Sequence, residues 1–297
     1  MLQTQNFQTT DHEIFKLLSV TGGIPWYIEQ MDGKKSADEN IKRHCFTPGG
    51  VLVEDFDLIF HELFVKRDEI YKKIIMALAN SPVDYSTISE KTNYPKSGRL
   101  TGYLNDLIKA GFVSKDEVWS LQTGKVLDLY HYRLSDNYLR FYLKYILPNK
   151  AHIEKKRIVS TLPAWESIMG LQFENLIVNN RHELYGVLNI RSEDVIYDNP
   201  YFQRKTKKKQ GCQIDFMIQT RLNTIYVIEI KFSKNPIGRN VIDAVKEKIN
   251  RICLPKNRVC LPVLIHVNGV SENLIAENYF HSIIEFGRFL SASVVRK

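Results

Sequence analysis

Two short apolar segments flank a polar turn centred on Leu222, and together they predict a β-hairpin over residues 213–232. In that hairpin Asp215 on the first strand lies opposite Glu229 on the second, on the same face, because strand side chains alternate. Like charges that face each other destabilise a sheet, so the pattern predicts a cation between the two carboxylates. Lys231 lies on the same face, and we expect a divalent metal ion to supply the remaining positive charge.

The second strand of this hairpin carries apolar residues on both faces at its start, which predicts a central strand covered on both sides. Glu229 and Lys231 stand at its carboxyl end, where an unpaired carboxylate would be costly to bury. Mg²⁺ offsets that cost, because carboxylate oxygens suit a hard cation. Such an ion activates water and stabilises charge on a phosphate, while a nearby lysine orients the nucleophile. Asp215, Glu229 and Lys231 are therefore the candidate catalytic residues.

An Asp, a turn and Glu-x-Lys on a buried strand resemble the core of the restriction-endonuclease-like nucleases, the PD-(D/E)xK superfamily. The resemblance implies a further acidic residue on the first core helix, at Glu174, so that Glu174, Asp215 and Glu229 hold the metal. Gln213 shares the hairpin face with Asp215 and is expected to be accessory. A salt bridge between two exposed charges explains an isolated Glu-x-Lys equally well, and the pattern does not decide whether the site cuts.

A net charge of +8 and a pI near 9.1 permit binding to nucleic acid without requiring it. The run at residues 204–209 carries five positive charges in six residues, just before the strand that holds Asp215. A solvated loop would explain this run, but a phosphate backbone that passes a metal site also needs nearby cations. The candidate nucleic-acid-binding residues of the run are Arg204, Lys205, Lys207, Lys208 and Lys209.

The middle of the chain predicts three helices followed by a hairpin, an order that resembles a winged helix. The predicted elements are helices at 69–78, 88–91 and 97–110 and strands that begin at 112 and return at 127–134. The third helix of such domains can enter a major groove, which makes Lys96 and Arg99 candidate DNA contacts. Its exposed face also carries Asp106, so packing against protein remains an open alternative.

The fold class expected from these patterns is a multi-domain α and α/β protein. Its parts are a helical lid-like segment (1–66), a winged helix-turn-helix domain (67–150) and a mixed-sheet restriction-endonuclease-like domain (151–297). The remaining expected elements are a helix that follows an N-cap at Asp11, a helix opened by Pro25, helices at 51–65, 164–181 and 239–251, strands at 194–197, 213–219, 224–232 and 258–267, and a late apolar stretch at 283–290.

Four stretches, in this order, make the chain similar to the carboxyl-terminal half of the archaeal-type ATPases of the AAA superfamily. They are residues 22–28 (GGIPWYI), 132–142 (YRLSDNYLRFY), 170–176 (GLQFENL), and 211–215 (GCQID) together with 229–234 (EIKFSK). The resemblance implies an ATPase lid, a winged helix and a restriction-endonuclease-like domain. No Walker A loop, Gly-x4-Gly-Lys-Ser/Thr, is present in these 297 residues.

ATP is therefore expected only through a missing or separate P-loop domain, and the gene product is expected to be truncated or split. Three functions stay open. The chain is a DNA-acting module that cleaves with Mg²⁺, a non-catalytic regulatory half that binds a separate P-loop ATPase subunit, or a decayed product without activity. DNA and that subunit are the expected partners.

Composition excludes several other classes. A basic-then-apolar leader and an apolar run of about 18 residues are both missing from the sequence, so a cytoplasmic protein without a membrane partner is expected. Cys45, Cys212, Cys253 and Cys260 form no CxxC pair, which favours buried free thiols. A Gly-x-Ser-x-Gly nucleophile elbow is also missing.

Overall fold

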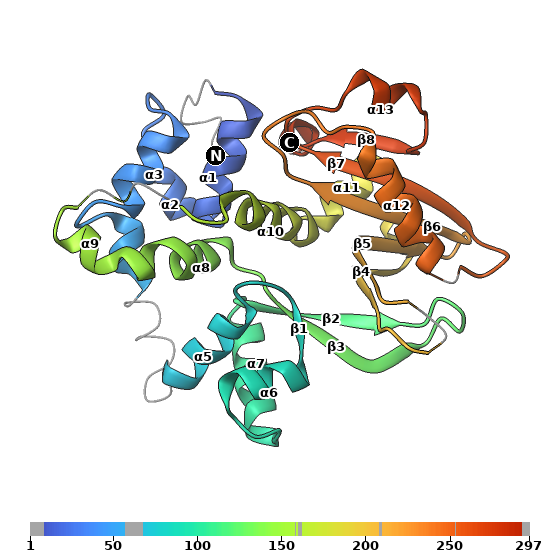
Figure 1. The fold of residues 1–297 in the computed structure, drawn as a ribbon, viewed down its shortest axis with the longest axis horizontal. Coiled ribbons are helices and arrows are strands. Elements are labelled where there is room, and N and C mark those ends of the chain that lie inside the picture. Colours follow the sequence, from blue (N-terminus) through green and yellow to red (C-terminus); the bar gives the residue numbers. More distant parts are fainter. Residues whose placement is uncertain are drawn as a thin grey trace. The chain divides into compact units, whose positions relative to one another are not determined.

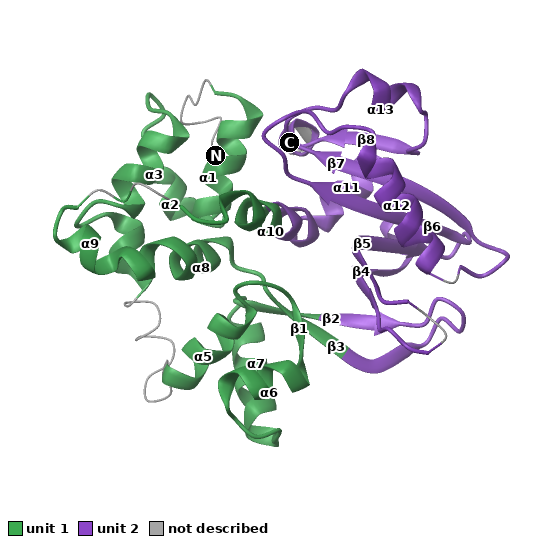
Figure 2. Ribbon diagram, in the orientation of Figure 1, with its two compact units in different colours: residues 1–115, 130–172 green, residues 116–129, 173–297 purple. Residues whose placement is uncertain are grey.

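A computed structural model describes residues 9–56, 68–157, 159, 162–207, 210–252 and 254–292. The chain separates into two compact units, coloured in Figure 2: unit 1 comprises residues 1–115 and 130–172, and unit 2 comprises 116–129 and 173–297. Helices combined with a mixed sheet confirm the expected mixture of α and β structure. The division into three segments at 66 and 150 stays a prediction.

Unit 1 is mainly helical (Figure 1). Its described helices are α1 Asp11–Thr21, α2 Pro25–Glu29, α3 Ala37–Cys45, α5 Asp68–Leu78, α6 Tyr85–Thr92, α7 Gly98–Lys109, α8 Asn137–Phe141 and α9 Lys150–Glu154, with a π-helical turn Tyr142–Ile146 and a 3₁₀ turn Leu147–Asn149 after α8. The helices predicted after Asp11, at Pro25, at 69–78 and at 97–110 are present, and the helix predicted at 88–91 is longer than expected. The helices at 37–45, 137–141 and 150–154 were not predicted. The N-cap of α1 is Thr10 rather than Asp11, because the Thr10 hydroxyl accepts the Glu13 N–H. Residues 51–56 of the predicted 51–65 helix are helical, and 57–65 lie outside the described residues.

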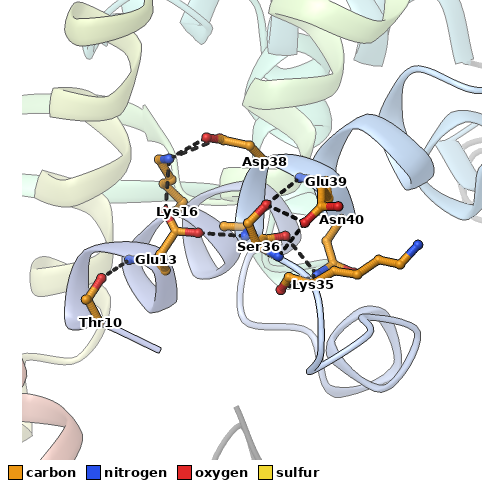
Figure 3. Close-up of polar contacts among 9 residues, drawn as sticks. Thr10, Glu13, Lys16, Lys35, Ser36, Asp38, Glu39 and Asn40 are labelled. Carbon is orange, nitrogen blue, oxygen red and sulfur yellow. Dashed lines mark hydrogen bonds and ion pairs between the residues drawn. The ribbon is translucent and has the colours of Figure 1, made fainter. Parts of the chain in front are cut away.

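Helix α3 begins with a capping box, drawn in Figure 3. The Ser36 hydroxyl accepts the Glu39 N–H at 3.2 Å, and the Glu39 carboxylate accepts the Ser36 N–H at 2.9 Å. A second carboxylate, from Glu13 of α1, accepts the Ala37 N–H at 2.7 Å, while Lys16 bridges Glu13 and Asp38. These bonds satisfy donors that the first turn of a helix leaves unpaired, and they attach α3 to α1.

Residues from three of the four stretches that resemble the ATPase family meet in the core of unit 1. The Arg140 guanidinium donates to the Gln172 side-chain oxygen at 2.7 Å, and the Gln172 amide donates to the carbonyls of Ser19 and Asn137 at 2.8 and 2.7 Å. Gly22 has φ +67°, and a Cβ there would approach the Tyr138 nitrogen to 3.3 Å. Packing within unit 1 therefore accounts for the residue types at these positions.

A small sheet joins β1 Val83–Asp84 to the hairpin of β2 Val113–Trp119 and β3 Val126–Leu134, in the order β1-β3-β2. The hairpin confirms the strands expected after α7, and Val83 pairs with Tyr132. The far end of the hairpin, residues 116–129, belongs to unit 2 (Figure 2).

The described part of unit 2 is built on a five-stranded sheet in the order β4-β5-β6-β7-β8. Its elements are β4 Val195–Gln203, β5 Cys212–Thr220, β6 Thr224–Lys231, β7 Val259–His266, β8 Ser282–Glu285, α11 Arg181–Leu188, α12 Asn240–Arg251, α13 Glu272–Ala276, α14 Gly287–Ala292 and the 3₁₀ turn Ser192–Asp194, with α10 Trp165–Asn179 at the boundary of the units. The strands β4, β5 and β6 are antiparallel, whereas β6, β7 and β8 are parallel. Helix α12 provides the crossover between β6 and β7 that parallel pairing requires.

Unit 2 departs from the sequence expectation at several elements. Strand β4 is longer than the predicted 194–197, and the apolar stretch at 283–290 divides into β8 and α14. Helices α11 and α13 were not predicted. Helix α12 covers the sheet face that carries Glu229, and Arg181 of α11 lies 5.8 Å above the Phe216 ring, on the opposite face.

The ends of β4, β6, β7 and β8 and the beginning of β5 lie at one edge of the sheet, which we call the carboxylate edge. Strand β4 ends there at Gln203 beside Cys212, where β5 begins. The last residue of β6, Lys231, pairs with His266 at the end of β7, and His266 pairs with Glu285 at the end of β8. Residues 204–207, the described part of the basic run, therefore follow β4 at the same edge at which Lys231 and Glu229 lie.

Candidate functional site

The hairpin register places the two candidate carboxylates side by side. Strands β5 and β6 pair through Phe216 and Ile228, and one further step of this register brings Asp215 opposite Glu229, as the turn centred on Leu222 predicts. The ladder stops at that step because the Asp215 carboxylate, rather than a backbone carbonyl, accepts the Ile230 N–H at 2.9 Å. This bond fixes the position of the Asp215 side chain against β6.

The cation between the carboxylates is Lys248, which comes from α12. Its ammonium nitrogen lies 3.2 Å from Oδ1 of Asp215 and 2.5 Å from Oε2 of Glu229. Lys231 makes a second contact to Glu229, with its Nζ 3.2 Å from Oε1. Glu229 is 2% exposed and Lys231 is 47% exposed, so the cluster extends from the core to the surface. The expectation of a cation between Asp215 and Glu229 is thus confirmed, and the cation present is a lysine.

The charges of this cluster shift the pKa values of two of its members, Asp215 and Lys248. Burial raises the pKa of Asp215, and the neighbouring Glu229 raises it further, against the opposing effects of Lys248 and the Ile230 N–H. Burial by itself would lower the pKa of the Lys248 ammonium, but Asp215 and Glu229 outweigh burial, so its pKa lies above the ordinary value. Lys248 therefore carries a firmly held positive charge.

The structure also gives the positions of the other two predicted metal-site residues, Glu174 and Gln213. Glu174 lies on α10 and is half-buried, and Gln213 is exposed on β5, paired with Phe202. Among the residues that the structure describes, no group of three or more His, Cys, Asp or Glu side chains gathers in an arrangement for a metal ion. Two converging carboxylates do match the oxygen ligands that Mg²⁺ prefers.

The predicted nucleic-acid-binding residues fall in two places. Lys96 and Arg99 are exposed at the beginning of α7 in unit 1. Arg204, Lys205 and Lys207 are exposed beyond the end of β4 in unit 2, at the carboxylate edge. Lys208 and Lys209 lie outside the described residues.

Sequence reasoning missed Lys248, although a signal for it was present. Val241 and Val245 are buried on the inward stripe of α12, and Lys248 follows at the next position of that stripe. A lysine on the inward stripe of an amphipathic helix needs a buried anionic partner. His266 is buried beside Lys231, and its Nδ1 accepts the Gly269 N–H at 3.2 Å.

Two of the three cysteines that the structure describes are buried, as expected. Cys45, Cys212 and Cys260 are free cysteines, the first two buried and the third half-buried. Cys253 lies outside the described residues. Burial raises the pKa of the Cys45 thiol, which opposes formation of a reactive thiolate.

Comparison with known proteins gives few relatives. The chain is 30% identical over 149 residues to the uncharacterized protein MJECL04 of Methanocaldococcus jannaschii, a match that covers 48% of this chain and 31% of the relative. The matched part is therefore less than a third of that protein's length. A solved structure, protein VC1899 from Vibrio cholerae, aligns with 82% of this chain and 53% of its own at 12% identity and a TM-score of 0.34. No family model matches the chain.

None of the helices in the described ranges is long and apolar enough to cross a membrane.

Proposed function

We propose that unit 2 binds a divalent cation, Mg²⁺ by the chemistry of its ligands, at Asp215 and Glu229, and hydrolyses phosphodiester bonds of nucleic acid there. The observation that carries the proposal is the convergence of both carboxylates on one point, within 3.2 Å of the same ammonium nitrogen. A bound Mg²⁺ would lower the pKa of a water ligand and stabilise charge on phosphate. Asp215 and Glu229 hold the ion in this proposal, and Lys231, at the exposed side, neutralises the phosphate.

Lys248 occupies the point that the ion would take, so metal binding requires its ammonium to move. The long lysine side chain is 26% exposed and can swing toward solvent. The free energy needed to displace the Lys248 ammonium therefore lowers the apparent affinity of the site for the metal ion.

The proposal is tested by titrating the full chain with Mn²⁺ and by incubating it with supercoiled DNA in Mg²⁺. The wild type is expected to bind the ion and nick the DNA, and Asp215→Asn to lose both. Lys231→Ala should keep metal binding and lose nicking. Asp243→Asn, which changes an exposed carboxylate on α12, is the control and should behave as the wild type. DNA that stays intact to the same extent with wild type and variants would reject the proposal.

A second candidate function follows from Lys248 itself. Lys248 already forms ion pairs with both carboxylates, and Lys231 forms a second one with Glu229, as expected of a nuclease-like fold that serves in binding rather than cleavage. In this case the chain serves as the regulatory half of an archaeal-type ATPase, with a winged helix formed by α5, α6, α7 and the β2–β3 hairpin. Lys248→Met separates the two functions: it raises Mn²⁺ affinity if the carboxylates are a metal site and leaves the chain without metal binding if they are a scaffold.

Membership of the ATPase family is supported by the four stretches and by their order in the chain. The bonds among Ser19, Asn137, Arg140 and Gln172 suit motifs that are retained for packing. Partner binding is tested by co-purification with a P-loop polypeptide encoded beside this chain. Asp215→Asn should not weaken that association, whereas the nuclease function depends on Asp215.

A further inference from the structure

A cavity of about 220 Å³ lies within unit 2, between the tip of the β2–β3 hairpin and β4. Its walls are mainly apolar. Leu121, Leu127 and Leu129 line it from the hairpin, and Tyr201 and Phe202 line it from β4. Leu127 is 43% exposed, which places an apolar side chain at an open part of the wall. The cavity is smaller than the pockets of roughly 300–1,000 Å³ that hold drug-sized ligands, so it suits a single ring system.

The hairpin tip is held firmly against the sheet. The indole N–H of Trp119 donates to Oε1 of Gln219 at 2.9 Å, and the Tyr197 hydroxyl donates to the Gly124 carbonyl at 2.6 Å. The rings of Trp119 and Tyr197 stack with centroids 4.9 Å apart. Because these contacts join residues on both sides of the cavity, its shape is already formed before a ligand enters.

Cations border the same cavity. Arg204 contributes to its lining, and the exposed Lys205 and Lys207 follow in the same segment. An apolar hollow beside a row of cations is complementary to a ligand with a flat apolar ring and a chain of negative charges. A nucleotide strand has both features.

The position of the cavity relative to the carboxylate cluster further restricts the class of ligand. Gln203, the last residue of β4, pairs with Cys212, which lies three residues before Asp215 on β5. The side-chain amide of Gln203 donates to the Arg251 carbonyl at 2.8 Å, and Arg251 lies one helical turn beyond Lys248 on α12. The cavity and the carboxylate cluster are thus attached to neighbouring ends of β4 and β5. Bases in a duplex are stacked and paired, so a base can enter such a cavity only from an unpaired strand.

We infer that this cavity receives one base of a single-stranded nucleic acid whose phosphates lie along Arg204, Lys205 and Lys207. The inference rests on the proposed function only for the choice of nucleic acid over another anionic ligand with an apolar ring. An acidic peptide is the competing occupant, and the experiment below separates the two.

The test measures binding of a fluorescently labelled oligo(dT) strand by the full chain in EDTA, so that neither a metal nor cleavage takes part. An abasic strand of equal length keeps the phosphates and lacks the bases, and it should bind the wild type about tenfold more weakly. Leu127→Asp puts a carboxylate at the cavity and should remove the difference between the two strands. Leu222→Asp makes the same change at a leucine 67% exposed in the β5–β6 turn, at the opposite edge of the sheet, and should preserve the difference.

The cations are tested by the salt dependence of binding. Lys205→Ala with Lys207→Ala should reduce the slope of log affinity against log salt by about 1.4, since each phosphate neutralised on a single strand contributes roughly 0.7. Arg221→Ala with Lys256→Ala removes two exposed cations from the opposite edge and should leave the slope unchanged.

Equal affinity of the wild type for oligo(dT) and the abasic strand would overturn the inference, as would tighter binding of an acidic peptide that Leu127→Asp abolishes. Failure of the metal-dependent nuclease leaves these measurements in EDTA unaffected. Loss of base-dependent binding, conversely, does not alter Mn²⁺ binding at Asp215, so the two failures can be told apart.

Discussion

At the scale of single residues, Lys248 decides the electrostatic state of the site. Its ammonium is shared between Asp215 and Glu229, and these two carboxylates outweigh the effect of burial and raise its pKa above the ordinary value. Glu229, which is 2% exposed, has little access to water as a substitute for this partner. Removal of the lysine therefore leaves two adjacent negative charges in a poorly solvated position.

Lys248→Met is expected to lower the free energy of unfolding by about 3 kcal/mol at neutral pH, the typical effect of removing one partner from a buried ion pair. The loss should shrink on acidification, because protonation neutralises the carboxylates. Urea unfolding at several pH values measures it. Lys246→Met, on the same helix, gives up a cation–π contact to Tyr279 and should cost about 1 kcal/mol or less. Equal losses for the two variants would contradict the role given to Lys248.

Asp215 should give the chain a characteristic pH dependence. Its pKa is raised on folding, so the folded chain retains a proton at pH values where the unfolded chain has lost it. As the pH falls from the raised pKa of Asp215 in the folded chain toward its ordinary pKa in the unfolded chain, the wild type therefore gains stability relative to Asp215→Asn. Above the folded pKa, the difference in unfolding free energy between the two proteins is constant. The effect is measured by subtracting the unfolding free energy of Asp215→Asn from that of the wild type at pH 7 and again at pH 4. Asp243→Asn is the control, and a difference that falls on acidification would contradict the prediction.

At the scale of elements, the local signals for helices and strands were sufficient for most of the fold. Helix α7 begins within one residue of its predicted start at Ser97, and the turn centred on Leu222 sets the register of β5 and β6 as predicted, because both features depend on residues that are neighbours in sequence. Helix α11 was not predicted, and strand β8 was merged with α14 into one predicted apolar stretch. Both segments are short and carry little periodicity of their own. Tertiary packing determines where such segments begin and end.

The capping box of α3 provides an element-scale prediction. Ser36→Ala removes the hydroxyl that accepts the Glu39 N–H, and it should lower the free energy of unfolding by about 1 kcal/mol. Thermal unfolding followed by circular dichroism checks this value. Ser81→Ala, at an exposed serine of the same unit, is the matched control and should change stability by no more than about 0.5 kcal/mol. If both variants unfold as the wild type does, the cap makes no net contribution.

At the scale of the whole molecule, the two units have different chemistry. Unit 1 contains two of the stretches that resemble the archaeal-type ATPases, 22–28 and 132–142, and the first residues of a third, in which Gln172 makes buried hydrogen bonds to Asn137 and Arg140. Unit 2 contains the carboxylate cluster, the basic segment after β4 and the cavity beside it. A Walker A loop is missing from all 297 residues, so nothing in the sequence provides the phosphate-binding loop of a P-loop ATPase.

This chain alone is therefore expected not to hydrolyse ATP. Phosphate release from ATP in Mg²⁺ should equal that of the heat-denatured chain, and addition of DNA should not change it. Steady release above that level, abolished by a single substitution in the chain, would contradict the expectation and require a nucleotide site of another type.

The sequence by itself determined that Asp215 faces Glu229, because a short turn and the alternation of strand side chains fix that pairing within fifteen residues. It also determined that a cation must lie between them. Only the tertiary structure decided that this cation is Lys248, since α12 must fold back over the sheet before its ammonium reaches the carboxylates. The cavity beside β4 likewise exists only once the hairpin tip, some eighty residues earlier in the chain, packs on that strand. Such contacts depend on how distant segments pack, which local patterns do not specify.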